Sequence, residues 1–181
     1  MSERMAAQIW IGGKVPAHLL PGLCREIDAE GVSLDWGGAH FSPKTAEDLL
    51  QARVDHDGAA VLYLCDEQAS WGRFDGLEAF LQEHGIPFTR RADGGAAYNG
   101  EIVEYRPGQD IVCIPIDADG EPVVDASVLR PVDELLTGAL EQLRNGSTDK
   151  AESILRDAQQ QLRAQLPPVV TTLEPFEIVH N

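Results

Sequence analysis

Hydrophobic and polar positions follow the same pattern in two stretches of the chain that match at an offset of 54 residues. Each stretch begins with an apolar strand-like run and continues with apolar residues at helical spacing. Each helical segment ends at a glycine, Gly31 or Gly85, which closes a helix cheaply in the left-handed conformation. The matched positions are Ile9 and Tyr63, Ile11 and Cys65, Leu23 and Leu77, Ile27 and Leu81, Val32 and Ile86, and Leu34 and Phe88. The pattern predicts two strand–helix–strand units.

Two such units in a short chain favour an α+β fold in which helices cover one face of an antiparallel or mixed sheet. A true duplication would make this arrangement ferredoxin-like, although any two such units share the same periodicity. Between the units, residues 45–54 are expected to form a short helix that Thr45 caps. After them, alternating residues predict strands at 101–105 and 111–116, and a turn at Asp119-Gly120 predicts a hairpin that ends with 122–124.

The last third of the chain changes to a helical period. Pro131 suits the first turn of a helix, and a second helix is expected after Asn145-Gly146, with Thr148 or Asp149 as its cap. The apolar stripes consist of Val132, Leu135, Leu136, Ala139, Leu140 and Leu143, and then of Ile154, Leu155, Ala158, Leu162 and Leu166. We therefore predict an α+β core domain at 1–125, a helical hairpin at 126–166 and a β-prone tail at 167–181, with Pro167-Pro168 ending the second helix.

Composition describes an acidic globular chain. Thirty Asp and Glu face fourteen Lys and Arg, a formal charge of −16 over 181 residues. No signal-peptide pattern or long apolar run is present, and Cys24, Cys65 and Cys113 lie singly within apolar patterns. The sequence predicts a cytoplasmic protein with buried thiols and no membrane segment. It also predicts no direct binding to nucleic acid, because its charge repels a phosphate backbone.

The acidic excess is concentrated between Glu101 and Glu141, where ten acids face two bases. A field of one sign attracts basic surfaces. We therefore expect a non-enzymatic interaction module that binds a basic partner protein. It could be an inhibitor or nucleic-acid mimic that acts on a nucleic-acid-processing complex, of the kind that mobile elements encode. The expected partner-binding residues are Asp110, Asp117, Asp119, Glu121 and Asp125.

A second hypothesis is a small metal-dependent or ligand-binding enzyme. The segment from Cys65 to Arg73 follows an apolar strand, and Asp66, Glu67, Trp71 and Arg73 could form a polar pocket there. A solvated loop explains the same residues. We identify no catalytic residue, cofactor motif or metal-ligand set. The Asp117 segment resembles the start of a calcium loop but has Pro122 and Val128 where Gly and Glu are required.

A third hypothesis is a structural subunit that assembles through its C-terminal helices. Two helices cover only part of each other's apolar surface, so the remainder must dock on the sheet of the same chain or on another copy. The β-prone tail could also add to an exposed strand edge, within the chain or in a neighbour. This reasoning predicts a homodimer whose interface includes Leu136, Leu140 and Phe176.

Overall fold

The computed structural model describes residues 3–95, 99–166 and 171–180. The chain divides into two compact units. The first, here the sheet unit, comprises Met1–Glu121 and Val169–Asn181, and the second, here the helical hairpin, comprises Pro122–Pro168. The C-terminal tail therefore belongs to the same unit as the N-terminal two-thirds of the chain.

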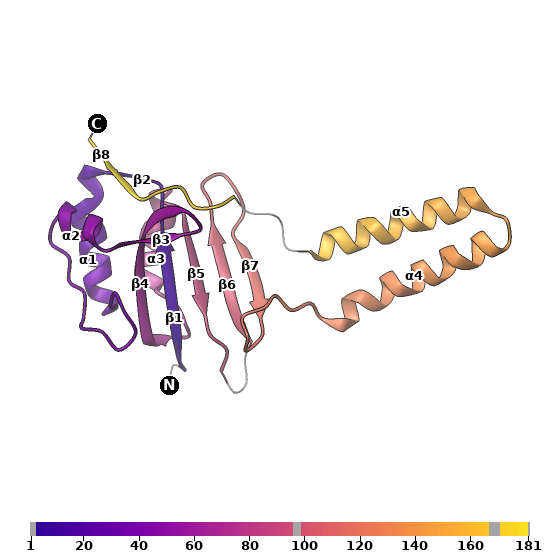
Figure 1. The fold of residues 1–181 in the computed structure, drawn as a ribbon, viewed down its shortest axis with the longest axis horizontal. Coiled ribbons are helices and arrows are strands. Elements are labelled where there is room, and N and C mark those ends of the chain that lie inside the picture. The colour runs from indigo at the N-terminus through magenta and orange to yellow at the C-terminus, as the bar shows by residue number, and fades with distance from the viewer. Residues whose placement is uncertain (1–2, 96–98, 167–170, 181) are drawn as a thin grey trace. The chain divides into compact units, whose positions relative to one another are not determined.

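A six-stranded antiparallel sheet forms the sheet unit, so the predicted α+β class is confirmed (Figure 1). Its strands, in spatial order, are β3 (Arg53–His56), β4 (Ala59–Ser70), β1 (Arg4–Ile11), β5 (Phe88–Ala92), β6 (Gly100–Tyr105) and β7 (Val112–Ile116). The most buried strand residues alternate along β1 and β5, which is the two-residue period expected of a sheet with one face on the core.

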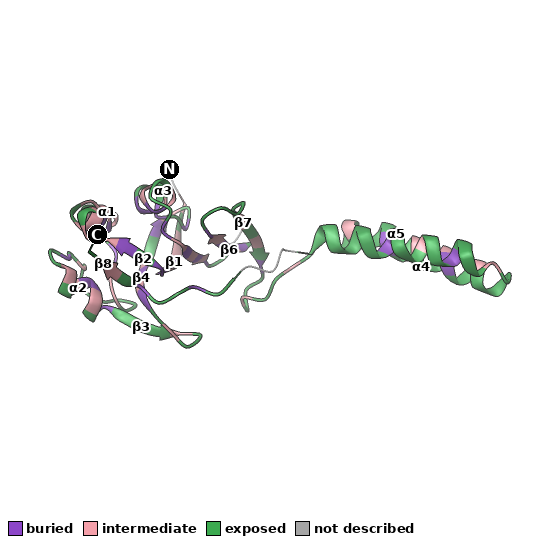
Figure 2. Ribbon diagram, turned by 90° about the horizontal axis from the view of Figure 1, so that it is seen from above, coloured by how far each residue is buried: buried purple, intermediate pink, exposed green. Residues whose placement is uncertain are grey.

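Helices α1 (Leu20–Glu30) and α3 (Asp75–Glu83) cover one face of this sheet and contact each other (Figure 2). Leu23 and Ile27 of α1 and Leu77 and Leu81 of α3 are fully buried against the sheet. Gly31 and Gly85 follow the two helices with φ of 73° and 64°. Both predicted helices and their glycine ends are thus confirmed.

The two strand–helix–strand units differ in how completely they form. In the second, β4 and β5 flank α3 in sequence, and β1 lies between them in the sheet, which is a split β-α-β arrangement. In the first, the strand expected at 32–34 is absent, and Ser33 makes only isolated bridges to Cys65 and His40. This correction has a local cause: Ser33 exchanges two backbone hydrogen bonds with Cys65, and the chain then turns, with the Gly38 N–H donating to the Asp35 carbonyl and the Phe41 N–H to the Val32 carbonyl.

The helix predicted between the units is confirmed as α2 (Ala46–Gln51), but it is shorter than the predicted 45–54, because Arg53 and Val54 belong to β3. Thr45 accepts a hydrogen bond from the Asp48 N–H, while the Asp48 carboxylate accepts one from the Thr45 N–H. This reciprocal capping box satisfies two of the donors that the start of a helix leaves free. A short 3-10 helix, Ala17–Leu19, precedes α1.

The C-terminal tail packs on the sheet unit. Strand β8 (Glu177–Val179) pairs in parallel with β2 (Lys14–Pro16), so the tail adds to a strand edge within its own chain. Phe176 donates its N–H to the Ala60 carbonyl, and its side chain is fully buried in the core. The strand-prone start of the tail, 169–170, lies outside the described residues, as does the Pro167-Pro168 stop.

A buried arginine joins the tail to the sheet. Arg106 follows β6 and is 6% exposed. Its guanidinium donates to the Thr171 carbonyl at 2.8 Å, the Phe88 carbonyl at 2.7 Å and the Thr89 hydroxyl at 3.1 Å. Burial lowers the pKa of Arg106, and Glu104 opposes that shift from 3.7 Å. One side chain thus satisfies acceptors on β5 and in the tail.

Helices α4 (Ala126–Arg144) and α5 (Thr148–Gln165) form the predicted hairpin. The helix starts earlier than expected, because Asp125 accepts the Ser127 N–H at 2.7 Å and caps it there. Pro131 consequently lies inside α4, where its missing N–H removes one backbone hydrogen bond. The N-cap of α5 is Ser147, not Thr148 or Asp149. Gly146 has φ of 75° between the helices.

Two smaller expectations are corrected. Residues 122–124 form no strand, and β7 pairs instead with β6, so the hairpin precedes β7 and does not follow it. Cys24 and Cys65 are buried as expected, but Cys113 is exposed because β7 is an edge strand. None of the helices described reaches the length and apolar character needed to cross a membrane.

Candidate functional site

The five acids expected to bind a partner do not lie on one surface. Asp110 precedes β7 and Asp117 follows it, so they occupy opposite ends of a five-residue strand. Asp125 belongs to the helical hairpin, where its carboxylate caps α4, and the contact with Ser127 lowers its pKa. Asp117 also has an internal role, because its carboxylate accepts the N–H groups of Asp119 and Glu121 at 2.9 Å each.

Sheet topology gathers a different set of acids. The strand register aligns one row of residues across the sheet, namely Asp66, Ala7, Ala92, Glu101 and Pro115. Because the strands are antiparallel, β1 and β6 begin near this row, and β4, β5 and β7 end near it. We call the acids in or beyond this row the acidic end, except Glu101, whose carboxylate accepts from the buried Arg90 at 2.6 Å. They are Glu3, Asp66, Glu67, Asp93, Asp117, Asp119 and Glu121, and Arg4, Arg73 and Arg91 lie among them.

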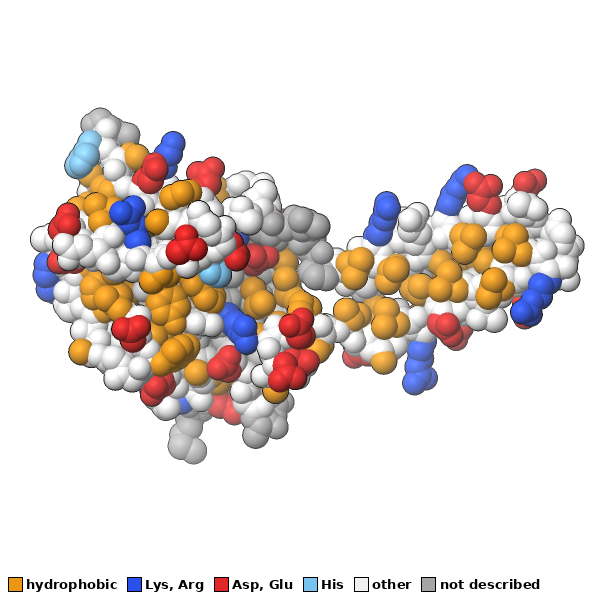
Figure 3. Space-filling view, in the orientation of Figure 1, with side chains coloured by type: hydrophobic (Ala, Val, Ile, Leu, Met, Phe, Trp, Pro, Cys, Tyr) orange, Lys and Arg blue, Asp and Glu red, His pale blue; other side chains and the backbone are white. Residues whose placement is uncertain are grey.

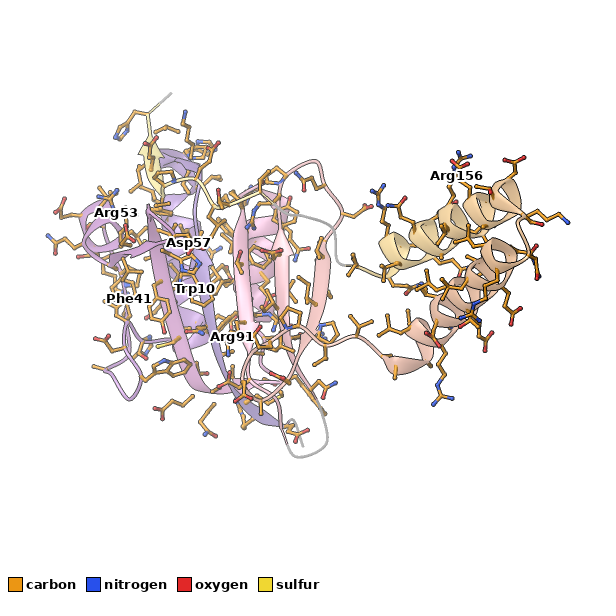
Figure 4. The ribbon with its side chains drawn as sticks, turned by 45° about the vertical axis from the view of Figure 1, so that its right-hand side comes forward. Trp10, Phe41, Arg53, Asp57, Arg91 and Arg156 are labelled. Atoms are coloured by element: carbon orange, nitrogen blue, oxygen red, sulfur yellow. The ribbon has the colours of Figure 1, made fainter. Side chains whose placement is uncertain are left out.

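Arg91 lies close to part of the acidic end, with its Nε 3.9 Å from Asp93 Oδ1. It lies on β5 opposite Gln8, on the face of the sheet turned away from α1 and α3 (Figure 4). A Cβ at Gly120 would overlap the Arg91 guanidinium, and Gly120 has φ of 84°. The turn at 117–120 therefore favours glycine for its conformation, whereas the flexible Arg91 side chain could move aside for a Cβ.

The same face carries an aromatic cluster that the sequence reasoning did not identify. Trp10 stacks on His56 with ring centroids 4.6 Å apart and also contacts Tyr63. The Tyr63 hydroxyl donates to the Gln8 side chain at 3.1 Å, and burial raises the pKa of Tyr63. These residues come from β1, β3 and β4, so only strand pairing brings them together.

The predicted polar pocket at 66–73 forms only in part. Strand β4 extends to Ser70, so Asp66 and Glu67 lie within the strand and not in a loop. Trp71 and Arg73 line a cavity of about 410 Å³ together with Met5, Ala92, Asn99 and Glu101. Asp66 and Glu67 do not line it. The structure therefore brings Trp71 and Arg73 to one cavity and leaves the two acids outside it.

A buried ion pair network lies beside that cavity. Arg90 is 2% exposed and donates to the Gly72 carbonyl at 2.7 Å and to Glu101 at 2.6 Å. Its Nε lies 2.9 Å from Glu78 Oε1, which also accepts the Phe74 N–H. Burial raises the pKa of Glu78, and the Arg90 charge opposes the rise. Every charge in the network has a partner, so removing one partner would leave another charge buried and uncompensated and would weaken the α3–sheet contact.

The helical hairpin presents an apolar surface. Alanines and Val132 fill the contact between α4 and α5, while leucines on both helices stay exposed. We call Leu129, Leu136, Leu140, Leu143, Leu155 and Leu162 the leucine face. A groove of about 420 Å³ runs between Leu136 on α4 and Leu155 and Leu162 on α5. Figure 3 shows hydrophobic side chains along both helices of the hairpin.

The three residues of the predicted dimer interface separate accordingly. Leu136 and Leu140 belong to the leucine face, with 42% and 56% of their surfaces exposed. Phe176 is buried in the sheet unit, where it packs in the core and cannot contribute to a surface contact in this conformation. Its apolar character reflects the core and not an interface.

No group of three or more acidic, histidine or cysteine side chains among the described residues is arranged to hold a metal ion. No protein-family model and no solved structure matches this chain. What it does must therefore be argued from its own surfaces.

Proposed function

We propose that this protein is an interaction module whose sheet unit binds a basic partner protein through the acidic end. One observation supports this proposal, namely the uneven division of charge between the units. The sheet unit has 23 acids and 9 bases, a net charge of −14, while the hairpin has 7 acids and 5 bases, a net charge of −2. Two of the sheet unit's cations, Arg90 and Arg106, are buried beside Glu78, Glu101 and Glu104.

The acidic end is suited to recognition because its acids sit on a rigid frame. The carboxylates lie on or directly beside four strands, β4, β1, β5 and β7, and across this part of the sheet, at about 4.8 Å between strands, they spread over roughly 20 Å. Glu67, Asp119 and Glu121 are exposed. Such a surface speeds encounters with an oppositely charged partner and limits wrong pairings more than it adds affinity.

Charge density favours a basic protein surface as the target over strict imitation of duplex DNA. A duplex carries about one phosphate per 1.7 Å, or about twelve over 20 Å. The acidic end has seven carboxylates and three neighbouring arginines. Inhibition of a nucleic-acid-processing complex by mimicry is a narrower form of the proposal, and competition with DNA would distinguish it.

The test uses two variants that change net charge equally. The acidic-end variant is Glu67→Lys, Asp119→Lys and Glu121→Lys, three exposed side chains. The control is Glu134→Lys, Glu141→Lys and Asp157→Lys, exposed positions of the hairpin. Each variant and the unmodified protein serve as bait in extracts of the native cell, and captured proteins are quantified.

We expect a basic partner that the unmodified protein and the control capture alike and that the acidic-end variant loses. The association rate of this partner should fall by about tenfold or more when the three acids are replaced by lysine. It should also fall as the salt concentration rises, since salt screens charges beyond about 8 Å at physiological ionic strength. Capture that is equal for all three baits, or independent of salt, would contradict the proposal. Release of the captured partner by duplex DNA would support mimicry.

A further inference from the structure

The leucine face belongs to a layer too thin to bury it. In the hairpin, the buried apolar residues among those described are Val132, Ala139, Ala151 and Ala158. Alanines let α4 and α5 approach closely, and they leave the longer leucine side chains at the rim of the contact. Leu136, Leu143 and Leu155 remain 42%, 47% and 43% exposed. Several neighbouring leucines at this exposure make a continuous apolar surface, which in soluble proteins marks an interaction site.

The spacing of these leucines indicates helices as the partner. Leu129, Leu136 and Leu143 follow one another at seven-residue intervals on α4, and Leu155 and Leu162 do so on α5. A seven-residue repeat keeps one apolar row facing a neighbouring helix along its length, as in coiled coils and four-helix bundles. The hairpin thus has two helices of a four-helix arrangement and exposes the side on which the other two would pack.

We infer that the leucine face pairs with the leucine face of a second copy of this chain, so that two hairpins form a four-helix bundle. A two-fold axis lets one surface serve both partners, so a self-complementary row needs no other protein. Charge agrees with this choice. The hairpin is close to neutral at −2, whereas two sheet units at −14 each would repel one another.

The size of the face is sufficient for a dimer. Nineteen residues of α4 extend over about 28 Å at 1.5 Å per residue, and two helices side by side are about 20 Å wide. The face therefore covers about 560 Å² per chain, and pairing would bury about 1,100 Å². Specific interfaces begin at roughly 1,000 Å² in total, so this interface lies at the lower end of the stable range. Dissociation on dilution is expected.

The experiment compares matched variants on the two sides of the hairpin. Leu136→Gln with Leu155→Gln alters two residues that line the same groove. Glu134→Gln with Ser153→Gln alters exposed residues two positions earlier on the same helices, which places them on the opposite side. Sedimentation equilibrium of the full chain measures mass from tens of nanomolar to tens of micromolar, and circular dichroism measures helix content.

The unmodified protein and the Glu134/Ser153 control should approach twice 19.7 kDa at the higher concentrations. The Leu136/Leu155 variant should stay monomeric with its helix content retained. If that variant loses its helices, the test is the mass of the unmodified protein, which should rise from monomer to dimer as its concentration increases. A monomer at tens of micromolar, or a dimer that the leucine substitutions leave intact, would overturn the inference. A monomer would mean that the leucine face packs on another surface of its own chain or binds a different protein.

Discussion

The sheet unit and the helical hairpin bury their apolar residues in different ways. Among the described residues, 25 buried hydrophobic positions belong to the sheet unit and four to the hairpin, of which three are alanines. The sheet unit encloses its core between the sheet, the helices and the returning tail. The hairpin is a single layer of two helices whose leucines lie at its surface. A closed core stabilises the sheet unit, while the hairpin depends for further stability on a packing partner for its leucine face.

The largest effect that tests this comparison is expected at Phe176. Phe176→Ala removes a fully buried ring from the core and should lower the free energy of unfolding by about 3–5 kcal/mol. Leu140→Ala, on the exposed face of the hairpin, should change it by less than about 1 kcal/mol in dilute protein. Urea denaturation of both variants provides the measurement. Similar losses at the two positions would mean that the hairpin is covered as completely as the core.

Two glycines of the hairpin should have effects of opposite sign. Gly146 has φ of 75°, so Gly146→Ala should destabilise the turn between α4 and α5 by about 1 kcal/mol. Gly138 lies inside α4 with no atom within 4 Å of an added Cβ, so Gly138→Ala should stabilise the helix by about 0.5–1 kcal/mol. Thermal unfolding followed by circular dichroism distinguishes them. Effects of the same sign would contradict either the left-handed conformation of Gly146 or the open space around Gly138.

The smallest effect concerns pH and the contact between α1 and α3. Glu30 accepts the N–H groups of Gly76 and Leu77 at the start of α3, and burial raises its pKa above 4.5. The folded chain therefore holds this proton more tightly than the unfolded chain does. The stability that Glu30 contributes is fully present below the unfolded pKa and is lost as the pH rises through the folded pKa.

Glu30→Gln keeps an acceptor for the two N–H groups but does not ionise. The melting temperature of the unmodified protein relative to Glu30→Gln should therefore fall between pH 4 and pH 7. Glu83→Gln, an exposed position at the end of α3, is the control and should show no such change. A relative melting temperature that rises with pH would show that hydrogen bonding to the carboxylate outweighs its burial.

Local chemistry made much of the secondary structure predictable. The apolar spacing of Leu23 and Ile27, and of Leu77 and Leu81, together with Gly31 and Gly85, located two helices and their ends. Thr45 located α2, and Asn145-Gly146 located the turn of the hairpin. These signals act within one or two helical turns, so they can be recognised without knowledge of the rest of the chain.

Errors arose where competing partners decide the outcome. Residues 32–34 have the alternation of a strand, yet only Ser33 bridges β4 before the chain turns and the Phe41 N–H bonds to the Val32 carbonyl. Pro131 resembles a helix start, but the Asp125 cap begins α4 five residues earlier than that position implies. Periodicity indicates what a segment can form, and pairing elsewhere determines whether it does.

The sequence by itself determined the charge, the helices and the leucine rows, because these depend on composition and short spacings. The tertiary structure alone decided which acids share an end of the sheet, since Glu3, Glu67 and Glu121 are brought together by strand order. It also decided that Phe176 belongs to the core, because β8 pairs with β2, a strand near the other end of the sequence. Contacts between distant segments depend on which surfaces meet, and no local pattern records that choice.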